Sequence, residues 1–438
     1  MSKIFLVGIG GISMSGIAKY ELKQGNQVYG SDIKENEEIK ELRKMGATIY
    51  LSQKAENIEK NLPIDLLVYS SAITIGSPGD AEIEVAKKQG VKILKRSEYL
   101  GSLTREFSTI AIAGMHGKTT VTAMLGYVLK EMGEEPLVFV GAETGIFDYS
   151  NVEIPSNKPK IMVIEACEYD GSFLDFSYDI GVILNIEPEH LDYFTEGLPQ
   201  ILKTFNTFSK INAQSGTIVA LDHPTVRQAL DGVDKKLVYF DPGELEKEKI
   251  ELKIPGAHNR LNALAVLKVI EKLGLSVPRA KEILKNFPGT KRRLEYRGEF
   301  KGVPLYDDYA HHPTEIKASI EAIHEKYPNN NLFLIFQPHQ YSRTTLLFDD
   351  FINSLSLVDK LCLVEVFGVA GREEMANCKN SNSLFEALKD QVSGLFYAKD
   401  YDQAENIIRK KINVNDILVV MGAGPINILA TKLIKNYE

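Results

Sequence analysis

The sequence predicts an α/β protein of three domains with mainly parallel sheets, and three observations support this prediction. Short apolar runs bounded by Gly, Ser or Asp alternate with longer helical patterns, which is typical of parallel strands joined by crossover helices. The chain has 438 residues, which suits about three domains at roughly 150 residues each. Two of the apolar runs also lead directly into glycine-rich turns that open a helical pattern.

The first hundred residues contain four candidate strands with amphipathic stretches between them. Two of these stretches, Glu37 to Met45 and Ala81 to Gln89, are predicted to be helices. The four predicted strands are Lys3 to Val7, Gln27 to Gly30, Leu66 to Tyr69 and Lys92 to Lys95.

Two further series of strands follow. The second series is Thr109 to Ala113, Ile161 to Glu165 and Gly181 to Asn185, and the third is Leu332 to Phe336, Lys360 to Val366, Leu395 to Ala398 and Asp416 to Met421. Charged connectors interrupt the series near residues 102–107 and 289–297, so we predict domains at residues 1–104, 105–294 and 295–438. The charged stretch at residues 241–250 is predicted to be a solvated excursion.

Composition and charge exclude several classes of protein. Hydrophobic residues make up 44% of the chain and charged residues 25%, which favours a globular fold over disorder. The net charge of -8 argues against a general nucleic-acid or membrane-surface binder. The three cysteines are far apart and lack metal-ligand spacing, which suits a reducing cytoplasm. No apolar run is long enough for a membrane span.

The first strand runs into a glycine turn, GIGGISMSG at residues 8–16, and the next strand ends at Asp32. Glycines allow the backbone to approach a diphosphate, which the amides of the following helix can bind. The turn nearly matches the dinucleotide fingerprint, with Ser13 where a third glycine is expected. It suits a dinucleotide, another diphosphate ligand or a purely structural turn. Asp32 is a candidate for a ribose hydroxyl or for a turn residue.

A second turn, GMHGKTT at residues 114–120, follows the strand that ends at Ala113. Such a loop points backbone amides at phosphates, places Lys118 on the terminal phosphoryl oxygens and offers the Thr119 hydroxyl to Mg²⁺. Ile112 stands where the usual motif has glycine, so this is a shortened variant. The loop predicts a nucleoside triphosphate site.

Acidic clusters follow two strands of the same series. EACEYD begins at Glu165, and EPEHLD occupies residues 187–192 and includes His190. The carboxyl ends of parallel strands meet at one edge of a sheet, where ligand crevices form. Mg²⁺ prefers hard oxygen ligands, so these clusters are candidates for metal binding beside the phosphate loop.

The ordered motifs resemble those of the Mur ligase family, and the resemblance covers essentially the whole chain. The motifs are GIGGISMSGIA, SSAI, AGMHGKTT, EACEYDGSFL, NIEPEHLDYF, PGAHNRLNAL with KRRLE after it, and DDYAHHPTE followed by QPHQYSRT. The resemblance implies an N-terminal Rossmann-like domain for a UDP sugar, a central ATPase domain with the phosphate loop, and a C-terminal Rossmann-like domain that brings an amino acid. The implied reaction is ATP-dependent ligation of L-alanine to the lactyl carboxylate of UDP-N-acetylmuramic acid through an acyl phosphate, in peptidoglycan synthesis.

The resemblance and the turns together give a set of expected site residues. For ATP these are Gly114, Met115, His116, Gly117, Lys118, Thr119, Thr120, His258, Asn259, Asn262 and Arg293. For the UDP sugar they are Gly10, Gly11, Asp32, Ser70 and Glu168, and for the amino acid Tyr309, His311, His339 and Arg343. The expected catalytic residues are Lys118, Asp308, His311 and Arg343, and the expected ligands of Mg²⁺ or Mn²⁺ are Thr119, Glu165 and His190.

Several alternatives stay open on the sequence. A recycling ligase that adds a tripeptide to the same UDP sugar shares these motifs. A nicotinamide-dependent oxidoreductase would use the first glycine turn, and a regulatory protein that hydrolyses ATP slowly would use only the second. Cys167 stands where an aspartate is common in the family, and Gln340 where some members carry arginine. Small-molecule substrates, no nucleic acid, no membrane and a monomer or homodimer are expected.

Overall fold

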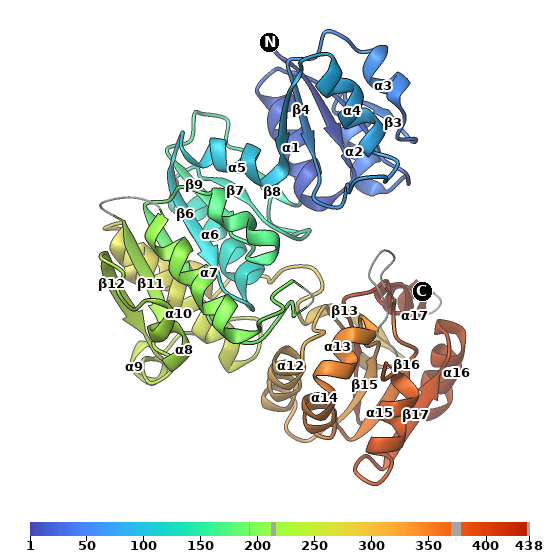
Figure 1. The fold of residues 1–438 in the computed structure, drawn as a ribbon. Coiled ribbons are helices and arrows are strands. Elements are labelled where there is room, and N and C mark those ends of the chain that lie inside the picture. The colour runs from blue at the N-terminus through green and yellow to red at the C-terminus, as the bar shows by residue number, and fades with distance from the viewer. Residues whose placement is uncertain (192, 212–215, 369–377, 436–438) are drawn as a thin grey trace. The chain divides into compact units, whose positions relative to one another are not determined.

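The computed structural model describes residues 1–191, 193–211, 216–368 and 378–435. Asp192, which belongs to the second acidic cluster, lies outside the described residues. The described chain forms three sheets, each flanked by helices (Figure 1). It divides into two compact units, residues 1–249 with 262–284 and residues 250–261 with 285–438. The first two sheets belong to the first unit and the third sheet to the second unit.

The first sheet has five parallel strands in the order β3-β2-β1-β4-β5. Its strands are β1 (Lys3–Val7), β2 (Gln27–Ser31), β3 (Thr48–Tyr50), β4 (Leu66–Tyr69) and β5 (Lys92–Lys95). Its helices are α1 (Ile12–Lys23), α2 (Glu37–Lys44), α3 (Ala55–Glu59), α4 (Asp80–Lys88) and α5 (Arg96–Thr104). The side chain of Asn36 caps α2 by accepting the Ile39 N–H at 2.9 Å, which satisfies one of its unpaired amides.

The second sheet has seven strands in the order β12-β11-β10-β6-β9-β7-β8. All neighbours are parallel except β7 and β8. Its strands are β6 (Ser108–Ala113), β7 (Leu137–Phe139), β8 (Val152–Glu153), β9 (Ile161–Glu165), β10 (Ile180–Ile183), β11 (Thr217–Leu221) and β12 (Lys236–Phe240). The accompanying helices are α6 (Lys118–Met132), the 3-10 helix η1 (Tyr169–Asp175), α7 (Leu198–Ile211), α8 (Pro224–Ala229), α9 (Glu244–Glu248), α10 (Ala257–Lys272) and α11 (Val277–Leu284).

The third sheet has six strands in the order β13-β14-β18-β15-β16-β17, with an antiparallel pair only between β13 and β14 among the described strands. Its strands are β13 (Glu295–Phe300), β14 (Val303–Asp308), β15 (Asn331–Phe336), β16 (Lys360–Val364), β17 (Gly394–Ala398) and β18 (Asp416–Met421). Its helices are α12 (Pro313–Lys326), α13 (Tyr341–Leu346), α14 (Phe348–Leu355), α15 (Ser381–Leu388), α16 (Tyr401–Lys411) and α17 (Asn427–Lys435).

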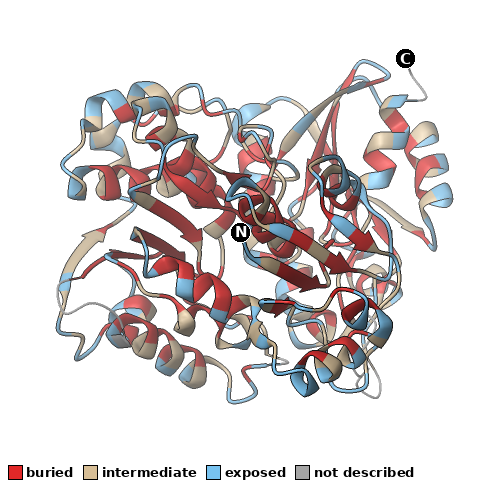
Figure 2. Cartoon of the chain, turned by 90° about the horizontal axis from the view of Figure 1, so that it is seen from above, coloured by how far each residue is buried: buried red, intermediate tan, exposed pale blue. Residues whose placement is uncertain are grey.

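Burial explains why the apolar runs predict the strands well. The central strands are almost wholly buried, and the helices alternate buried and exposed positions (Figure 2). The predicted α/β class with mainly parallel sheets is confirmed. Two strands end earlier than predicted. β10 ends at Ile183 and not at Asn185, and β16 ends at Val364 and not at Val366. The charged stretch at 241–250 contains the short helix α9, which buries none of its residues. None of the helices in the described ranges is long and apolar enough to cross a membrane.

A buried lysine connects the first sheet to the second. Lys19 of α1 is fully buried, and its Nζ lies 2.7 Å from carboxylate oxygens of both Glu38 and Glu41. The same ammonium donates to Asn151 Oδ1 at 3.0 Å and to the Tyr149 carbonyl at 3.2 Å. Since Asn151 precedes β8, the ammonium ties α1 and α2 to the edge of the second sheet. Removing one member of a buried ion pair destabilises the folded state, because the other charge stays buried without its partner.

We expect Lys19→Met to destabilise this part of the molecule by about 3 kcal/mol, because Glu38 would stay buried without its cation. The measurement is the first transition of urea unfolding, followed by circular dichroism. Lys40→Met is the matched control, since the Lys40–Glu37 pair of α2 is exposed and should leave the transition unchanged. Equal transitions for the two variants would contradict this account of Lys19.

Candidate functional site

The second glycine turn joins β6 to α6 through a tight backbone path. Gly114 and Gly117 have φ angles of 137° and 84°, a region that residues with a Cβ rarely adopt. A Cβ on Gly114 would lie 3.0 Å from Leu184 Cβ, so a side chain there would also need its neighbours to shift. Lys118 and Thr119 are the first two residues of α6. The turn therefore presents the amino end of a helix, which attracts phosphate groups.

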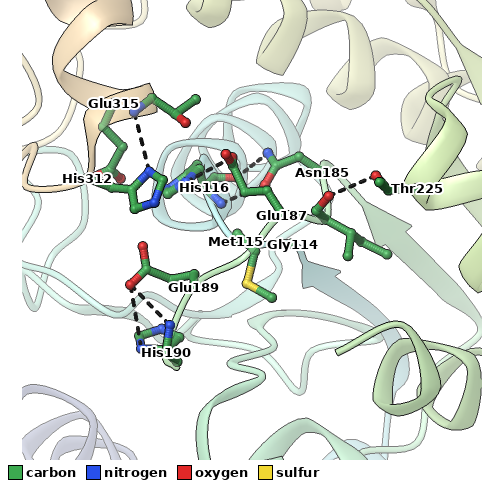
Figure 3. Close-up of polar contacts among 12 residues, drawn as sticks. Gly114, Met115, His116, Asn185, Glu187, Glu189, His190, Thr225, His312 and Glu315 are labelled. Atoms are coloured by element: carbon green, nitrogen blue, oxygen red, sulfur yellow. Dashed lines mark hydrogen bonds and ion pairs between the residues drawn. The ribbon is translucent and has the colours of Figure 1, made fainter. Parts of the chain in front are cut away.

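Asn185 anchors the outer part of this loop (Figure 3). Its Oδ1 accepts the His116 N–H at 2.8 Å, and its Nδ2 donates to the His116 carbonyl at 2.9 Å. Its own carbonyl accepts the Met115 N–H at 3.3 Å. The His116 ring lies 2.9 Å from Glu187 Oε1. One asparagine just beyond β10 thus fixes two consecutive residues of the loop.

Lys118 lies in a buried ion pair at the start of α6. Its Nζ is 2.9 Å from Glu168 Oε2 and donates to the Gly114 and Met115 carbonyls at 2.5 and 3.0 Å. Burial alone would lower the pKa of Lys118, but Glu168 and other acidic neighbours outweigh it and raise that pKa. Burial would raise the pKa of Glu168, which Lys118 and His190 nevertheless hold below its usual value. Both groups are therefore charged at neutral pH.

His190 shares the same carboxylate. Its Nε2 lies 3.3 Å from Glu168 Oε1, and its ring packs edge-on against Tyr169 with centroids 5.1 Å apart. Its backbone φ is 53°, which is unusual for a residue with a side chain. Figure 3 shows the ring beside Glu189, whose Oε1 is 4.0 Å from Nδ1. Lys118 and His190 thus both contact the buried carboxylate of Glu168.

Glu165, at the end of β9, faces the hydroxyl of Thr119. The Thr119 Oγ1 lies 3.1 Å from each carboxylate oxygen, and the Gly141 N–H donates to Oε2 at 2.8 Å. A hydroxyl and a carboxylate side by side are hard oxygen donors of the kind that Mg²⁺ prefers. The Nδ1 of His190 is buried without a hydrogen bond in the described part of the chain. Thr119, Glu165 and His190 therefore fit a divalent cation chemically.

A cavity of about 350 Å³ connects this region with the first glycine turn. Gly11 and Ser70 line one part of it, and Glu165 and Cys167 line another. Burial, with Glu168 nearby, raises the pKa of the Cys167 thiol to about 11, so the group is a neutral thiol at physiological pH.

Gly10 and Asp32 build the first turn itself. The Gly10 N–H donates to Asp32 Oδ2 at 2.9 Å, and the Ile33 N–H donates to Oδ1 at 2.8 Å. A Cβ on Gly10 would lie 2.9 Å from the same carboxylate. Asp32 thus stabilises the turn in the structure, and its predicted ribose contact stays a prediction.

Asn262 lies against the phosphate loop from α10. A Cβ on Gly117 would be 2.8 Å from Asn262 Oδ1, which places this amide directly at the start of α6. Asn259, three residues earlier, lies on the same side of α10. Its Nδ2 donates to the Pro255 carbonyl at 2.7 Å. Burial and the nearby Arg293 lower the pKa of His258, at the start of α10, to about 4, so its ring is neutral.

In the second unit, most of the residues that are predicted to bind the amino acid lie close together. The His311 Nδ1 lies 3.1 Å from the Tyr309 carbonyl and 3.3 Å from Glu315 Oε2. The rings of His311 and His339 are 6.1 Å apart, and Arg343 Nη1 donates to the His339 carbonyl at 3.3 Å. These side chains form one polar cluster beyond β14 and β15.

Arg293 and Asp308 lie beside this cluster in different roles. The Arg293 guanidinium is 5.2 Å from the centre of the Tyr309 ring and 3.4 Å from Glu315 Oε1. Asp308 is 2% exposed and accepts the Ser319 hydroxyl at 2.5 Å and the Ala310 N–H at 3.2 Å. Burial raises its pKa. Because both of its oxygens are engaged within the unit, the structure presents Asp308 as a group that orders the loop after β14.

Comparison with known proteins decides the family. Residues 3–108 match the model described as Mur ligase family, catalytic domain, residues 112–241 the Mur ligase middle domain, and residues 292–424 the Mur ligase, glutamate ligase domain. A UDP-N-acetylmuramate--L-alanine ligase of Clostridium acetobutylicum is 37% identical over 97% of this chain and 95% of that protein. Its counterpart in Aquifex aeolicus is 35% identical over 98% of this chain and 96% of that protein. The chain belongs to the Mur ligase family.

Solved structures agree with this assignment. The UDP-N-acetylmuramate-alanine ligase of Thermotoga maritima has a TM-score of 0.81 and 28% identity, with 100% of this chain and 99% of that chain covered. A murein peptide ligase of Psychrobacter arcticus has a TM-score of 0.71 at 21% identity, with 99% of this chain and 98% of that chain covered, which shows the shared fold. Mur ligases are ATP-dependent enzymes that form a C–N bond.

In this Mur ligase, the structure brings several of the predicted site residues together and shows supporting contacts that the sequence did not predict. Thr119 and Glu165 come together as expected. Glu168 pairs with Lys118 and His190. Its expected contact with the UDP sugar stays a prediction. Asn185 and Gly141 were not predicted. Gly141 has a weak sequence signal, since it lies just beyond a strand end and has no side chain. Asn185 is the first residue of the NIEPEHLDYF motif, but its contact with the loop depends on the fold.

We expect Asn185→Ala to weaken the binding of ADP about tenfold, because the peptide groups of His116 would lose both side-chain partners. The affinity can be measured by calorimetry on the purified protein. Asn185→Asp is the comparison variant, since it keeps an acceptor for the His116 N–H but turns a carboxylate oxygen toward the His116 carbonyl. Because it also adds a negative charge beside the phosphate loop, it should weaken ADP binding at least as much as Asn185→Ala. Parent-like affinity in the alanine variant would show that the loop holds its shape without this anchor.

Proposed function

We propose that this protein joins L-alanine to the lactyl carboxylate of UDP-N-acetylmuramic acid, with conversion of ATP to ADP and phosphate. The observation that carries the proposal is the cavity that runs from the first glycine turn to Glu165, beside the phosphate loop. Such a cavity suits a ligand with a diphosphate at one end and a reacting acid at the other. The names of the relatives in Clostridium acetobutylicum and Aquifex aeolicus support the choice of sugar and amino acid. We also propose a cytoplasmic location, where ATP is available.

The phosphate loop is the proposed ATP site. The amides of residues 114–120 would bind the phosphates, and Asn259 and Asn262 on α10 would contact the adenosine part. Lys118 would turn from the carbonyls of the loop to the terminal phosphoryl group, where its charge stabilises the transition state. Glu168 would keep Lys118 charged and hold it near the loop when no nucleotide is bound.

Thr119, Glu165 and His190 are the proposed ligands of Mg²⁺, with Mn²⁺ as the alternative. A divalent ion at this position would neutralise charge on the phosphate oxygens. The hydroxyl of Thr119 and the carboxylate of Glu165 fit such an ion better than the imidazole does, because hard cations prefer oxygen. The Gly141 amide would keep Glu165 aimed at the ion.

ATP is needed because a carboxylate is a poor electrophile. In the proposed first step an oxygen of the lactyl carboxylate attacks the γ-phosphorus, and the bond to ADP breaks. The nitrogen of L-alanine then attacks the carbonyl carbon of the acyl phosphate, and phosphate leaves.

Arg343 is proposed to bind the carboxylate of L-alanine through charge-assisted hydrogen bonds. The Nδ1 of His311 faces the Tyr309 carbonyl, which makes Nε2 the basic nitrogen of the neutral ring. We assign Nε2 as the acceptor of the ammonium proton. Tyr309 and His339 flank this histidine. Asp308 would fix the loop that carries His311, as its internal hydrogen bonds indicate.

The test is release of ADP from ATP with UDP-N-acetylmuramic acid and each amino acid in turn. We expect release to depend on both the sugar and an amino acid, with the highest kcat/KM for L-alanine. Incorporation of a tripeptide but not of free L-alanine would instead identify a recycling ligase. ADP release without either substrate would favour a simple ATPase, and binding of NADH would favour an oxidoreductase.

Gly141→Ala tests the metal site. An added Cβ would lie 2.7 Å from Glu165 Oε2, so the carboxylate must move. We expect the Mg²⁺ concentration for half-maximal activity to rise about tenfold, as for other groups that orient a ligand. Gly145→Ala is the control in the same loop, because its Cβ would meet nothing within 4 Å. An unchanged Mg²⁺ requirement in Gly141→Ala would contradict the role of Glu165.

A further inference from the structure

Arg96 has a side chain whose binding partner is missing among the described residues. It is the first residue of α5 and lines the cavity that runs to Glu165. Its Nε is buried and has no hydrogen-bond partner within the described chain. A guanidinium is always charged and carries five N–H donors, and a buried donor without an acceptor is costly. The cavity is therefore lined by a cation that has no anionic partner among the described residues.

Other arginines of the same compact unit have partners. Arg43 pairs with Glu35, and Arg227 pairs with Asp222. Arg105, at the other end of α5, donates to the carbonyls of Gly101 and Asp175. Arg96 differs from them by facing a cavity. Glu165 does not neutralise Arg96, since its carboxylate accepts from Thr119 and Gly141 instead.

The sheet register shows what surrounds Arg96. In the parallel pairing of β4 with β5, Tyr69 is opposite Lys95, so Ser70 and Arg96 directly follow paired residues. In the pairing of β1 with β4, Val7 is opposite Tyr69, so the first glycine turn begins at the same level. The glycine turn, Ser70 and Arg96 therefore lie at the carboxyl ends of three adjacent strands. This edge of a parallel sheet is where ligands bind.

We propose that Arg96 binds the diphosphate of the nucleotide sugar, opposite the amides at the amino end of α1. The inference rests on the proposed function and deepens it. A fork of N–H donors matches phosphate oxygens well, and Gly11, Ile12 and Ser13 at the start of α1 line the same cavity.

The lactyl carboxylate is the other anion of the substrate, but it must reach the γ-phosphoryl group beside Lys118 and attack it. A guanidinium bound to that carboxylate would lower its nucleophilicity. A guanidinium bound to the diphosphate leaves the reacting atoms unchanged. We therefore assign Arg96 to the diphosphate and not to the carboxylate.

The experiment compares two ligands that share a diphosphate and differ in the carboxylate. UDP-N-acetylmuramic acid and UDP-N-acetylglucosamine, which lacks the lactyl group, are titrated by calorimetry into the parent, Arg96→Gln and Lys95→Gln. We expect Arg96→Gln to weaken both ligands by the same factor, about 10- to 100-fold, with the kcat at saturating substrate close to that of the parent. Lys95→Gln removes an exposed charge one residue away and should match the parent.

Three other results of the titration overturn the inference, each in a distinct way. Unchanged affinity of Arg96→Gln for both ligands shows that Arg96 does not bind substrate. A loss for the muramic acid alone assigns Arg96 to the carboxylate. An equal loss in Lys95→Gln shows only a general effect of charge. If Arg96→Gln loses affinity as expected but the parent never incorporates an amino acid, the proposed function fails while the diphosphate contact stands; if the parent binds neither UDP sugar, both fail. Circular dichroism confirms that each variant is folded.

Discussion

The buried ion pair between Lys118 and Glu168 is the interaction on which the rest of the site depends. A phosphate-binding lysine must stay charged inside a buried loop before any phosphate arrives, and burial opposes that charge. Glu168 supplies the counter-charge and holds His190 as well. This arrangement is possible because strand order places β6 between β10 and β9, so the segments after all three strands meet at one edge. The fold thus brings Glu168 and Lys118 together from segments that are 50 residues apart in the chain.

The distribution of charge explains how a protein of net charge -8 could bind the proposed substrates, which carry many negative groups. No broad positive surface is needed, because each anion would have a local partner under the proposed function. These partners are the amino ends of α1 and α6, Lys118, Arg96 and, in the second unit, Arg343. Local donors of this kind also give specificity, since each is aimed at one group of a ligand. Glu165, one of the acidic neighbours that raise the pKa of Lys118, is also a proposed ligand of the divalent cation.

The sequence predicted the parts of the site that depend on local pattern. Apolar runs gave most strands nearly to the residue, and the turns at residues 8–16 and 114–120 fall where glycine is required by backbone angle or by close packing. The sequence did not predict the partners of Glu168 or the anchor at Asn185, because these contacts depend on sheet order. The short strands β3, β7 and β8 were missed, since two or three residues carry too little periodicity. The longer strands β11, β12, β13 and β14 were missed as well. The predicted domain boundaries stay predictions.

The most direct test asks whether the terminal phosphoryl group of ATP is transferred to the lactyl carboxylate, and it traces the oxygen atoms of that carboxylate. UDP-N-acetylmuramic acid labelled with ¹⁸O in both oxygens of its lactyl carboxylate is incubated with ATP, L-alanine and the protein, and the released phosphate is analysed by mass spectrometry. Transfer of the terminal phosphoryl group to the carboxylate predicts one labelled oxygen in each phosphate. Phosphate without label, formed together with the alanine product, would show that the acid is not activated by the nucleotide in the loop around Lys118.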